Sequence, residues 1–153
     1  MRKKNYRTAF CSGRCRTLVL CLTVRKGMII KMKIKRLDYD FSICKTEDYS
    51  LVNFNAQYCF IGKTDEENSL VCLTADVPPN VTERDDGWCA FRIQGVLDFS
   101  LVGILSKISA LLAENKIGIF AVSTFNTDYV FTKAESFDKA LSVLSCAGYE
   151  IID

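Results

Sequence analysis

The feature that most constrains the fold is a change of hydrophobic period near Ser100. Residues 88–94 alternate between two faces, as in a β-strand. From Ser100 onward the apolar residues recur at helical spacing and form one stripe. The stripe comprises Leu101, Ile104, Leu105, Ile108, Leu111 and Leu112. Ser100 is placed to cap this helix, and Asn115 or Gly118 to end it. The sequence therefore predicts a strand followed by an amphipathic helix.

A β-hairpin and a second helix follow. Residues 118–123 and 129–132 read as strands joined by a turn at Asn126-Thr127-Asp128, and residues 135–147 read as a helix that ends at Gly148. A short strand, 149–152, closes the chain. The predicted order is βαββαβ, the split βαβ or ferredoxin-like arrangement of the α+β class. Right-handed crossovers then place both helices on one face of an antiparallel sheet.

The N-terminal half has a weaker pattern. Residues 41–46, 57–63 and 69–74 resemble strands, and Thr64-Asp65 is placed to cap a turn. Residues 77–87 read as a polar loop holding both prolines, with 83–86 as its solvated part. We expect a diverged second copy of the βαββαβ unit here, although no internal repeat aligns. The predicted domains are therefore 33–87 and 88–153.

The net charge of +2 conceals two unlike parts. Residues 1–32 carry nine Lys/Arg and no Asp/Glu, whereas residues 33–153 carry 11 basic and 18 acidic residues, a net charge of −7. The apolar run 17–24 is too short to span a membrane, and no small-residue cleavage site follows it. We expect 1–32 to be a basic leader outside the fold. A mis-called start before Met28 or Met32, a disordered tail and a targeting signal remain open.

The chain contains no histidine, which excludes His-dependent triads, general bases and metal sites. The five cysteines of residues 33–153 (Cys44, Cys59, Cys72, Cys89 and Cys146) form no C-x-x-C motif. Four of them lie in apolar runs, where a thiol behaves as a small buried hydrophobe. We expect a reduced, cytoplasmic protein that is not an enzyme and needs no cofactor or metal.

Three segments carry a family resemblance. The segment 98–105 places an acidic residue in the turn and a glycine at the helix entrance, 112–119 passes from helix to strand, and 123–130 contains S-T-F-N-T-D. Together they resemble the ACT domain family, small βαββαβ modules that bind amino acids and regulate metabolism. The S-T-F-N-T-D turn is similar to a branch of tandem ACT proteins that includes the animal cytosolic arginine sensors. The usual Arg-Pro-Gly after the acidic residue is replaced here by Phe-Ser-Leu-Val-Gly.

The resemblance implies a ligand site at the helix entrance and the hairpin end. Its candidate residues are Asp98, Phe99, Ser100, Leu101, Val102, Gly103, Thr124, Asn126, Thr127 and Asp128. A helix N-terminus suits the carboxylate of an amino acid, and Asp98 could pair with its ammonium group. Purely structural roles remain open. Asp98 could cap the turn, Gly103 could permit close helix–sheet packing, and residues 126–128 could form only a tight turn.

We therefore expect a non-catalytic module that binds a free amino acid between ACT units, two packed in tandem or across a homodimer. It would pass the signal to a separate protein partner. An assembly module that keeps the ACT fold without ligand binding is the alternative. An RNA-binding ferredoxin-like domain is disfavoured because residues 33–153 are acidic and lack the aromatic RRM signature. We expect neither a nucleic-acid nor a membrane partner.

Overall fold

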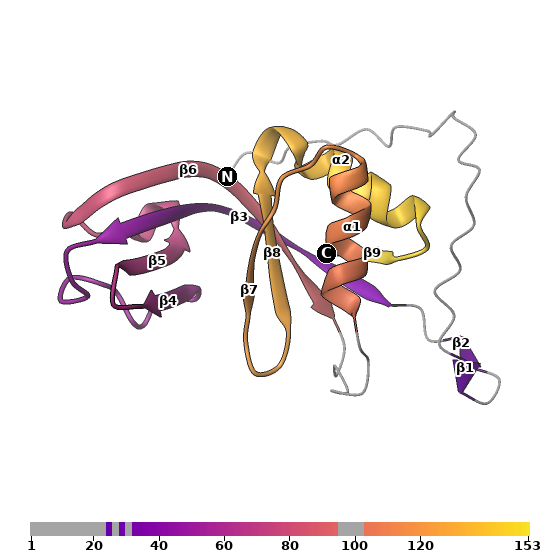
Figure 1. Ribbon diagram of the computed structural model, residues 1–153, viewed down its shortest axis with the longest axis horizontal. Coiled ribbons are helices and arrows are strands. Elements are labelled where there is room, and N and C mark those ends of the chain that lie inside the picture. Colours follow the sequence, from indigo (N-terminus) through magenta and orange to yellow (C-terminus); the bar gives the residue numbers. More distant parts are fainter. Residues whose placement is uncertain (1–23, 26–27, 30–31, 95–102) are drawn as a thin grey trace.

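Two long antiparallel strands organise the molecule. The computed structural model describes residues 24–25, 28–29, 32–94 and 103–153. Strands β3 (Lys33–Thr46) and β6 (Val81–Gln94) each have 14 residues and pair along most of their length. In Figure 1 they run from the end of the molecule that holds β4 and β5 to the end that holds both helices. They therefore belong to both halves of the fold.

The remaining elements attach to these two strands. The sheet order is β4-β5-β3-β6-β8-β7, and β9 pairs in parallel with the first residues of β3. The bounds are β4 Cys59–Lys63, β5 Asn68–Leu73, the 3-10 turn η1 Thr74–Asp76, α1 Ile104–Glu114, β7 Phe120–Ser123, β8 Asp128–Lys133, α2 Ala134–Cys146 and β9 Glu150–Ile152. A separate two-stranded ladder joins β1 (Val24–Arg25) and β2 (Met28–Ile29). Met32, the last residue of the predicted leader 1–32, is also described and packs against the core beneath the helices. The other residues of that leader lie outside the described residues.

The C-terminal half confirms the predicted fold class. Its elements follow the order β6-α1-β7-β8-α2-β9, and both helices cover one face of the sheet. Their core joins Ile108 and Leu144 to Phe91 and Val130 of the sheet. The last strand, however, pairs with β3, whose first residues lie between β9 and β6.

The ends of α1 differ from the sequence prediction. The helix begins at Ile104 with Gly103 as its N-cap, so the prediction that Ser100 caps it is wrong. Gly103 has a φ of 81°, which interrupts the helical backbone at that residue. At the other end Lys116, not Asn115 or Gly118, has the left-handed conformation. The N–H groups of Lys116 and Ile117 donate to Ala113 and Leu112, forming a Schellman motif.

The predicted end of α2 is confirmed. Gly148 follows the C-cap residue Ala147 and has a φ of 99°. The N–H groups of Gly148 and Tyr149 donate to Ser145 and Leu144, the same pattern that ends α1. This motif turns the chain sharply into β9.

The N-terminal half contains the three predicted strands but no α-helix within residues 33–87. A loop, 47–58, covers one face instead, with Tyr49 and Val52 packed on Leu70 and Cys72. The expected polar loop is wrong over residues 81–87, which form the first part of β6 and pair with β3. These residues are polar because both faces of this stretch are largely exposed. The expected boundary at residue 87 thus falls inside a strand.

The sheet curls so that β4 reaches β8. Residues 38–40 of β3 lie opposite Cys89 alone, a bulge that bends the strand. On the inner face Phe60 of β4 lies with its ring centroid 4.9 Å from that of Tyr129 and 6.0 Å from that of Phe131. Phe41 lies 5.2 Å from Phe131 in an edge-to-face contact. Aromatic contacts therefore close the curl.

Candidate functional site

The predicted site is only partly described. Residues 98–102, which include Asp98, Phe99, Ser100, Leu101 and Val102, lie outside the described residues. Gly103 stands at the start of α1, and Thr124 to Asp128 form the β7–β8 turn. The described part of the site is therefore a helix N-terminus and a hairpin end.

The hairpin end is fixed by its own hydrogen bonds. The backbone N–H and Oγ1 of Thr124 lie 2.9 and 2.8 Å from the carbonyl oxygen of Thr127. The Thr127 N–H donates back to Thr124 Oγ1 at 3.3 Å. Asp128 pairs with Ser123 at the first rung of the hairpin. This geometry accounts for Thr124 as a turn residue and leaves Asn126 at the tip.

Thr127 also connects the turn to β6. Its hydroxyl donates to the carbonyl oxygen of Ile93, one residue before β6 ends. The segment 95–102 leaves from this end of β6 and leads to Gly103. The hydrogen bond therefore places the predicted turn residues at the C-terminal end of β6.

Gly103 is required by its backbone rather than by close packing. Among the described residues, a Cβ atom at this position would meet only Ser106 Oγ, at 3.8 Å, an ordinary contact. The described residues therefore give Gly103 no close packing contact that would exclude a side chain. Its φ of 81° lies in the left-handed region, which other residues rarely adopt. No described side chain caps the helix, and the first N–H groups of an α-helix have no partner within the helix itself.

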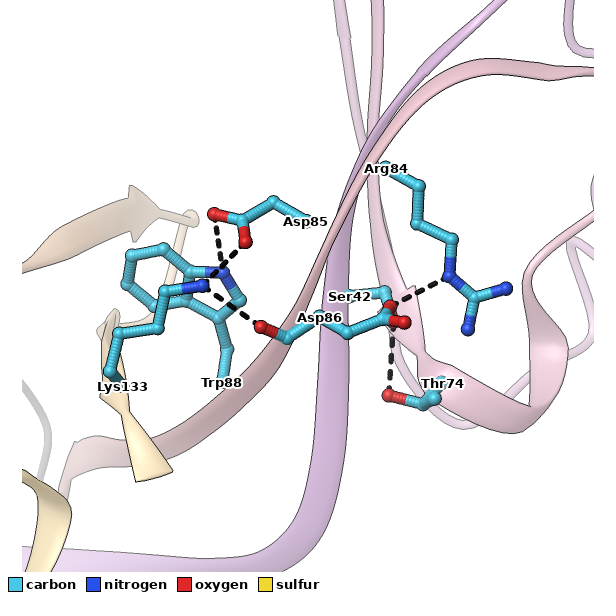
Figure 2. Close-up of polar contacts among 7 residues, drawn as sticks. All are labelled: Ser42, Thr74, Arg84, Asp85, Asp86, Trp88 and Lys133. Atoms are coloured by element: carbon cyan, nitrogen blue, oxygen red, sulfur yellow. Dashed lines mark hydrogen bonds and ion pairs between the residues drawn. The ribbon is translucent and has the colours of Figure 1, made fainter. Parts of the chain in front are cut away.

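A polar network that the sequence did not predict joins β8 to β6 (Figure 2). Lys133 Nζ lies 2.5 Å from Asp85 Oδ1, 2.9 Å from the Asp86 carbonyl oxygen and 4.4 Å from the ring centroid of Trp88. Trp88 Nε1 donates to the other oxygen of Asp85 at 3.2 Å. The ammonium group is therefore held by a carboxylate, a carbonyl and an aromatic face.

The same network extends to β3 through Asp86. Its Oδ1 accepts from Arg84 Nε at 2.7 Å and from Ser42 Oγ at 2.5 Å, and Ser42 lies 3.0 Å from Thr74 Oγ1. The hydrogen bond from Lys133 lowers the pKa of Asp85, and those from Arg84 and Ser42 lower the pKa of Asp86. Residues 83–86 are therefore not merely a solvated loop. No local sequence signal indicated a strand here, because Glu83-Arg84-Asp85-Asp86 are all charged and show no alternation of polar and apolar residues.

The described residues offer little for catalysis. They contain no group of three or more Cys, Asp or Glu side chains that could hold a metal ion. Burial raises the pKa of Cys44, Cys59 and Cys72, which disfavours a reactive thiolate at each of them. Among the helices that the structure describes, none has the length and apolar character needed to cross a bilayer.

Comparison with solved structures shows a fold shared over most of the chain. Protein Atu0741 from Agobacterium tumefaciens is 30% identical with a TM-score of 0.71, over 80% of this chain and 92% of that one. Protein VC0802 of unknown function from Vibrio cholerae is 16% identical (TM-score 0.62; 77% and 91% covered). The regulatory subunit of aspartate kinase from Thermus thermophilus is 12% identical (TM-score 0.55; 76% and 98% covered). The last two show similarity of fold alone.

Sequence comparison names the family. No sequence among the curated proteins matches the chain at a significant level. Residues 83–146, from β6 to the end of α2, match the family model of the ACT domain. This range covers the strands and both helices that carry Gly103 and the Thr124–Asp128 turn. Together with the relative that is 30% identical over nearly its full length, this match shows that the chain belongs to the ACT domain family.

Proposed function

We propose that the protein is a non-catalytic regulatory module that binds a free amino acid at an interface between ACT units and passes the signal to a separate partner. The observation that carries the proposal is the ACT match over 83–146, combined with a fold like that of an aspartate kinase regulatory subunit. The scarcity of catalytic groups among the described residues is consistent with it. Such a module acts by stabilising one packing of its units.

The proposed site has two parts that are complementary to an amino acid. The N–H groups at the start of α1 would bind the carboxylate, because a helix N-terminus carries partial positive charge. Asp98 would pair with the ammonium group. The proposed contacts are Asp98, Phe99, Ser100, Leu101, Val102, Gly103, Thr124, Asn126, Thr127 and Asp128. The Thr127–Ile93 hydrogen bond supports this site because it holds the turn at the end of β6, one residue before the chain leaves that strand toward Asp98.

A common hairpin supports descent of the two halves from one unit. Thr64 closes the β4–β5 turn by donating its N–H to Glu67 O at 3.0 Å and accepting from Glu67 N at 3.1 Å. Thr124 and Thr127 repeat these bonds between β7 and β8. We propose a tandem pair in which the N-terminal unit lacks its helices. The amino-acid interface would then lie across a homodimer, in the cytoplasm.

A thermal-shift screen of the full chain against the twenty amino acids tests ligand binding. One or a few amino acids at millimolar concentration should raise Tm, since a ligand that binds only the folded state stabilises it. Arginine is one arm of the screen and tests the predicted resemblance to the arginine-sensor branch. Asp98→Asn should abolish the shift, whereas Asp65→Asn in the other hairpin turn should preserve it.

Mass spectrometry of ligands carried through native purification gives an independent reading. If no amino acid raises Tm and none co-purifies, ligand sensing is wrong. An assembly module without a ligand would then be the better account. It predicts that Asp98→Asn changes neither ligand nor partner behaviour.

A further inference from the structure

The outer hairpin of the N-terminal half brings two cysteines into register. Strands β4 and β5 are antiparallel, and Cys59 lies directly opposite Cys72. Directly opposite residues project their side chains to the same face of a sheet. Both thiols accordingly belong to one apolar cluster, with Leu70, Val52 and Cys44. Both are reduced in this structure.

The spacing of such a pair suits a disulfide. Opposite residues in antiparallel strands have Cα atoms about 4.5 or about 5.5 Å apart, depending on the type of pair. Disulfides span Cα separations of about 4.4 to 6.8 Å, so either type falls within the range. Cys44 belongs to β3, which pairs with the other edge of β5. There it lies opposite Leu70, so it is only a diagonal neighbour of Cys72. Diagonal neighbours are about 7–8 Å apart, beyond that range.

We propose that Cys59 and Cys72 form a redox-modification site that peroxide converts to a cross-strand disulfide. Cys59 is partly exposed, whereas Cys72 is 2% exposed, so oxidation begins at Cys59. The Cys59 thiolate attacks one oxygen of hydrogen peroxide and becomes a sulfenic acid, with release of water after protonation. Cys72 then attacks that sulfur, loses its proton and displaces a second water. Two thiols and one peroxide give one disulfide and two waters.

The environment makes this site slow to oxidise. Burial raises the pKa of Cys59, and it raises the pKa of Cys72 to about 12. Because the thiolate is the nucleophile, both steps are slower than at a solvated thiol. The site therefore responds to sustained peroxide. The bond would fasten β4, whose Phe60 contacts Tyr129 of β8, to the next strand.

Peptide mapping tests the proposal on the full chain. The protein is treated with hydrogen peroxide, blocked with N-ethylmaleimide and digested with trypsin without reduction. Cleavage after Arg36, Lys45, Lys63 and Arg84 isolates each cysteine of the cluster on its own peptide, 37–45, 46–63 and 64–84. The 46–63 and 64–84 peptides should appear linked, with the loss of two hydrogens, and separate after reduction. This link should exceed that between 37–45 and 64–84 by roughly tenfold, because only the first pair lies within disulfide range.

Two controls keep the result interpretable. Cys44→Ser should leave the Cys59–Cys72 link intact, whereas Cys59→Ser should abolish it without creating a Cys44–Cys72 link. Oxidation of the wild-type chain in urea should lose the preference, and this comparison does not depend on any variant folding. The proposal is overturned if the folded chain shows no more of the link than the urea-unfolded chain. It is equally overturned if Cys44–Cys72 forms as readily, or if Cys59 is oxidised further while Cys72 remains a thiol.

Discussion

At the scale of single residues, Gly103 and Lys133 contribute to the C-terminal half in different ways, Gly103 through its backbone conformation and Lys133 through its side chain. Gly103 has a φ of 81° immediately before α1, and the described residues around it leave space for a Cβ atom. Any strain from a side chain would therefore come from the backbone conformation. Lys133 by contrast acts through its side chain, which connects β8 to the carboxylate of Asp85 and the ring of Trp88.

Replacing Gly103 by alanine should destabilise the fold. The left-handed conformation costs a non-glycine residue about 1–2 kcal/mol, which should appear as a lower free energy of unfolding in urea. Gly118→Ala is the matched control, because Gly118 has no positive φ and a Cβ there meets nothing within 4 Å. Its stability should stay the same or rise by about 0.5 kcal/mol. Equal stability of the two variants would contradict the argument.

The carboxylates of the network should make stability depend on acid pH. The pKa values of Asp85 and Asp86 are lowered in the folded state by their hydrogen-bonded partners. Their contribution is therefore complete above the unfolded pKa of about 3.9 and is lost as pH falls through the folded value. In Asp85→Asn, Tm should therefore decrease less than in the wild type as the pH is lowered from about 6 to about 3.

The control for this pH profile is Asp65→Asn, which removes an exposed carboxylate from the β4–β5 turn. It should keep the wild-type slope. Added salt should weaken the wild-type dependence, because the pair between Lys133 and Asp85 is exposed to solvent. A steep acid profile that survives in Asp85→Asn would assign the dependence to other groups.

At the scale of elements, the aromatic contact between β4 and β8 closes the curled sheet. Phe60 touches Tyr129 and Phe131, whereas Ile61 lies on the other face of β4 and is 40% exposed. Phe60→Ala should lower the free energy of unfolding by about 2 kcal/mol, since a partly buried ring is lost from an aromatic cluster. Ile61→Ala should lower it by less than half as much. Denaturant titration followed by near-ultraviolet circular dichroism measures both, and equal losses would refute the role of Phe60.

The spacing of hydrophobic residues correctly predicted those helices and strands that bury one face and expose the other. Helix α1 and strand β8 are examples, because Ile108 and Val130 face the shared core. The first part of β6 escaped prediction because its residues are exposed on both faces and are held by pairing with β3. Strand pairing partners depend on the whole chain, so the place of β3 between β9 and β6 could not be read from local pattern.

In the candidate site, too, the sequence predicted local contacts but not contacts between residues far apart in the chain. The S-T-F-N-T-D motif correctly predicted a turn, because the Thr124 bonds are local. The Thr127–Ile93 bond joins residues far apart in sequence, and so does the Lys133–Asp85 pair. Neither produces a signal in a single sequence. Sequence reasoning therefore found the residues of the turn but not what holds it in place.

At the scale of the whole molecule, the described chain carries one pair of helices for two halves. The N-terminal half has strands and a covering loop where a complete unit would have helices. A ligand that needs helix N-termini from two complete ACT units must therefore find the second one on another copy of the chain. The proposed amino-acid site would therefore depend on the oligomeric state of the protein.

The resulting prediction is that ligand binding and dimer formation are coupled. An amino acid that raises Tm should also shift the monomer–dimer equilibrium toward the dimer in sedimentation velocity, and the shift in Tm should increase with protein concentration. Asp98→Asn should remove both effects together, and Asp65→Asn should remove neither. If the amino acid raises Tm while the sedimentation coefficient and its concentration dependence stay unchanged, the ligand binds within one chain. The helix-poor N-terminal half would then have to supply the second side of the site.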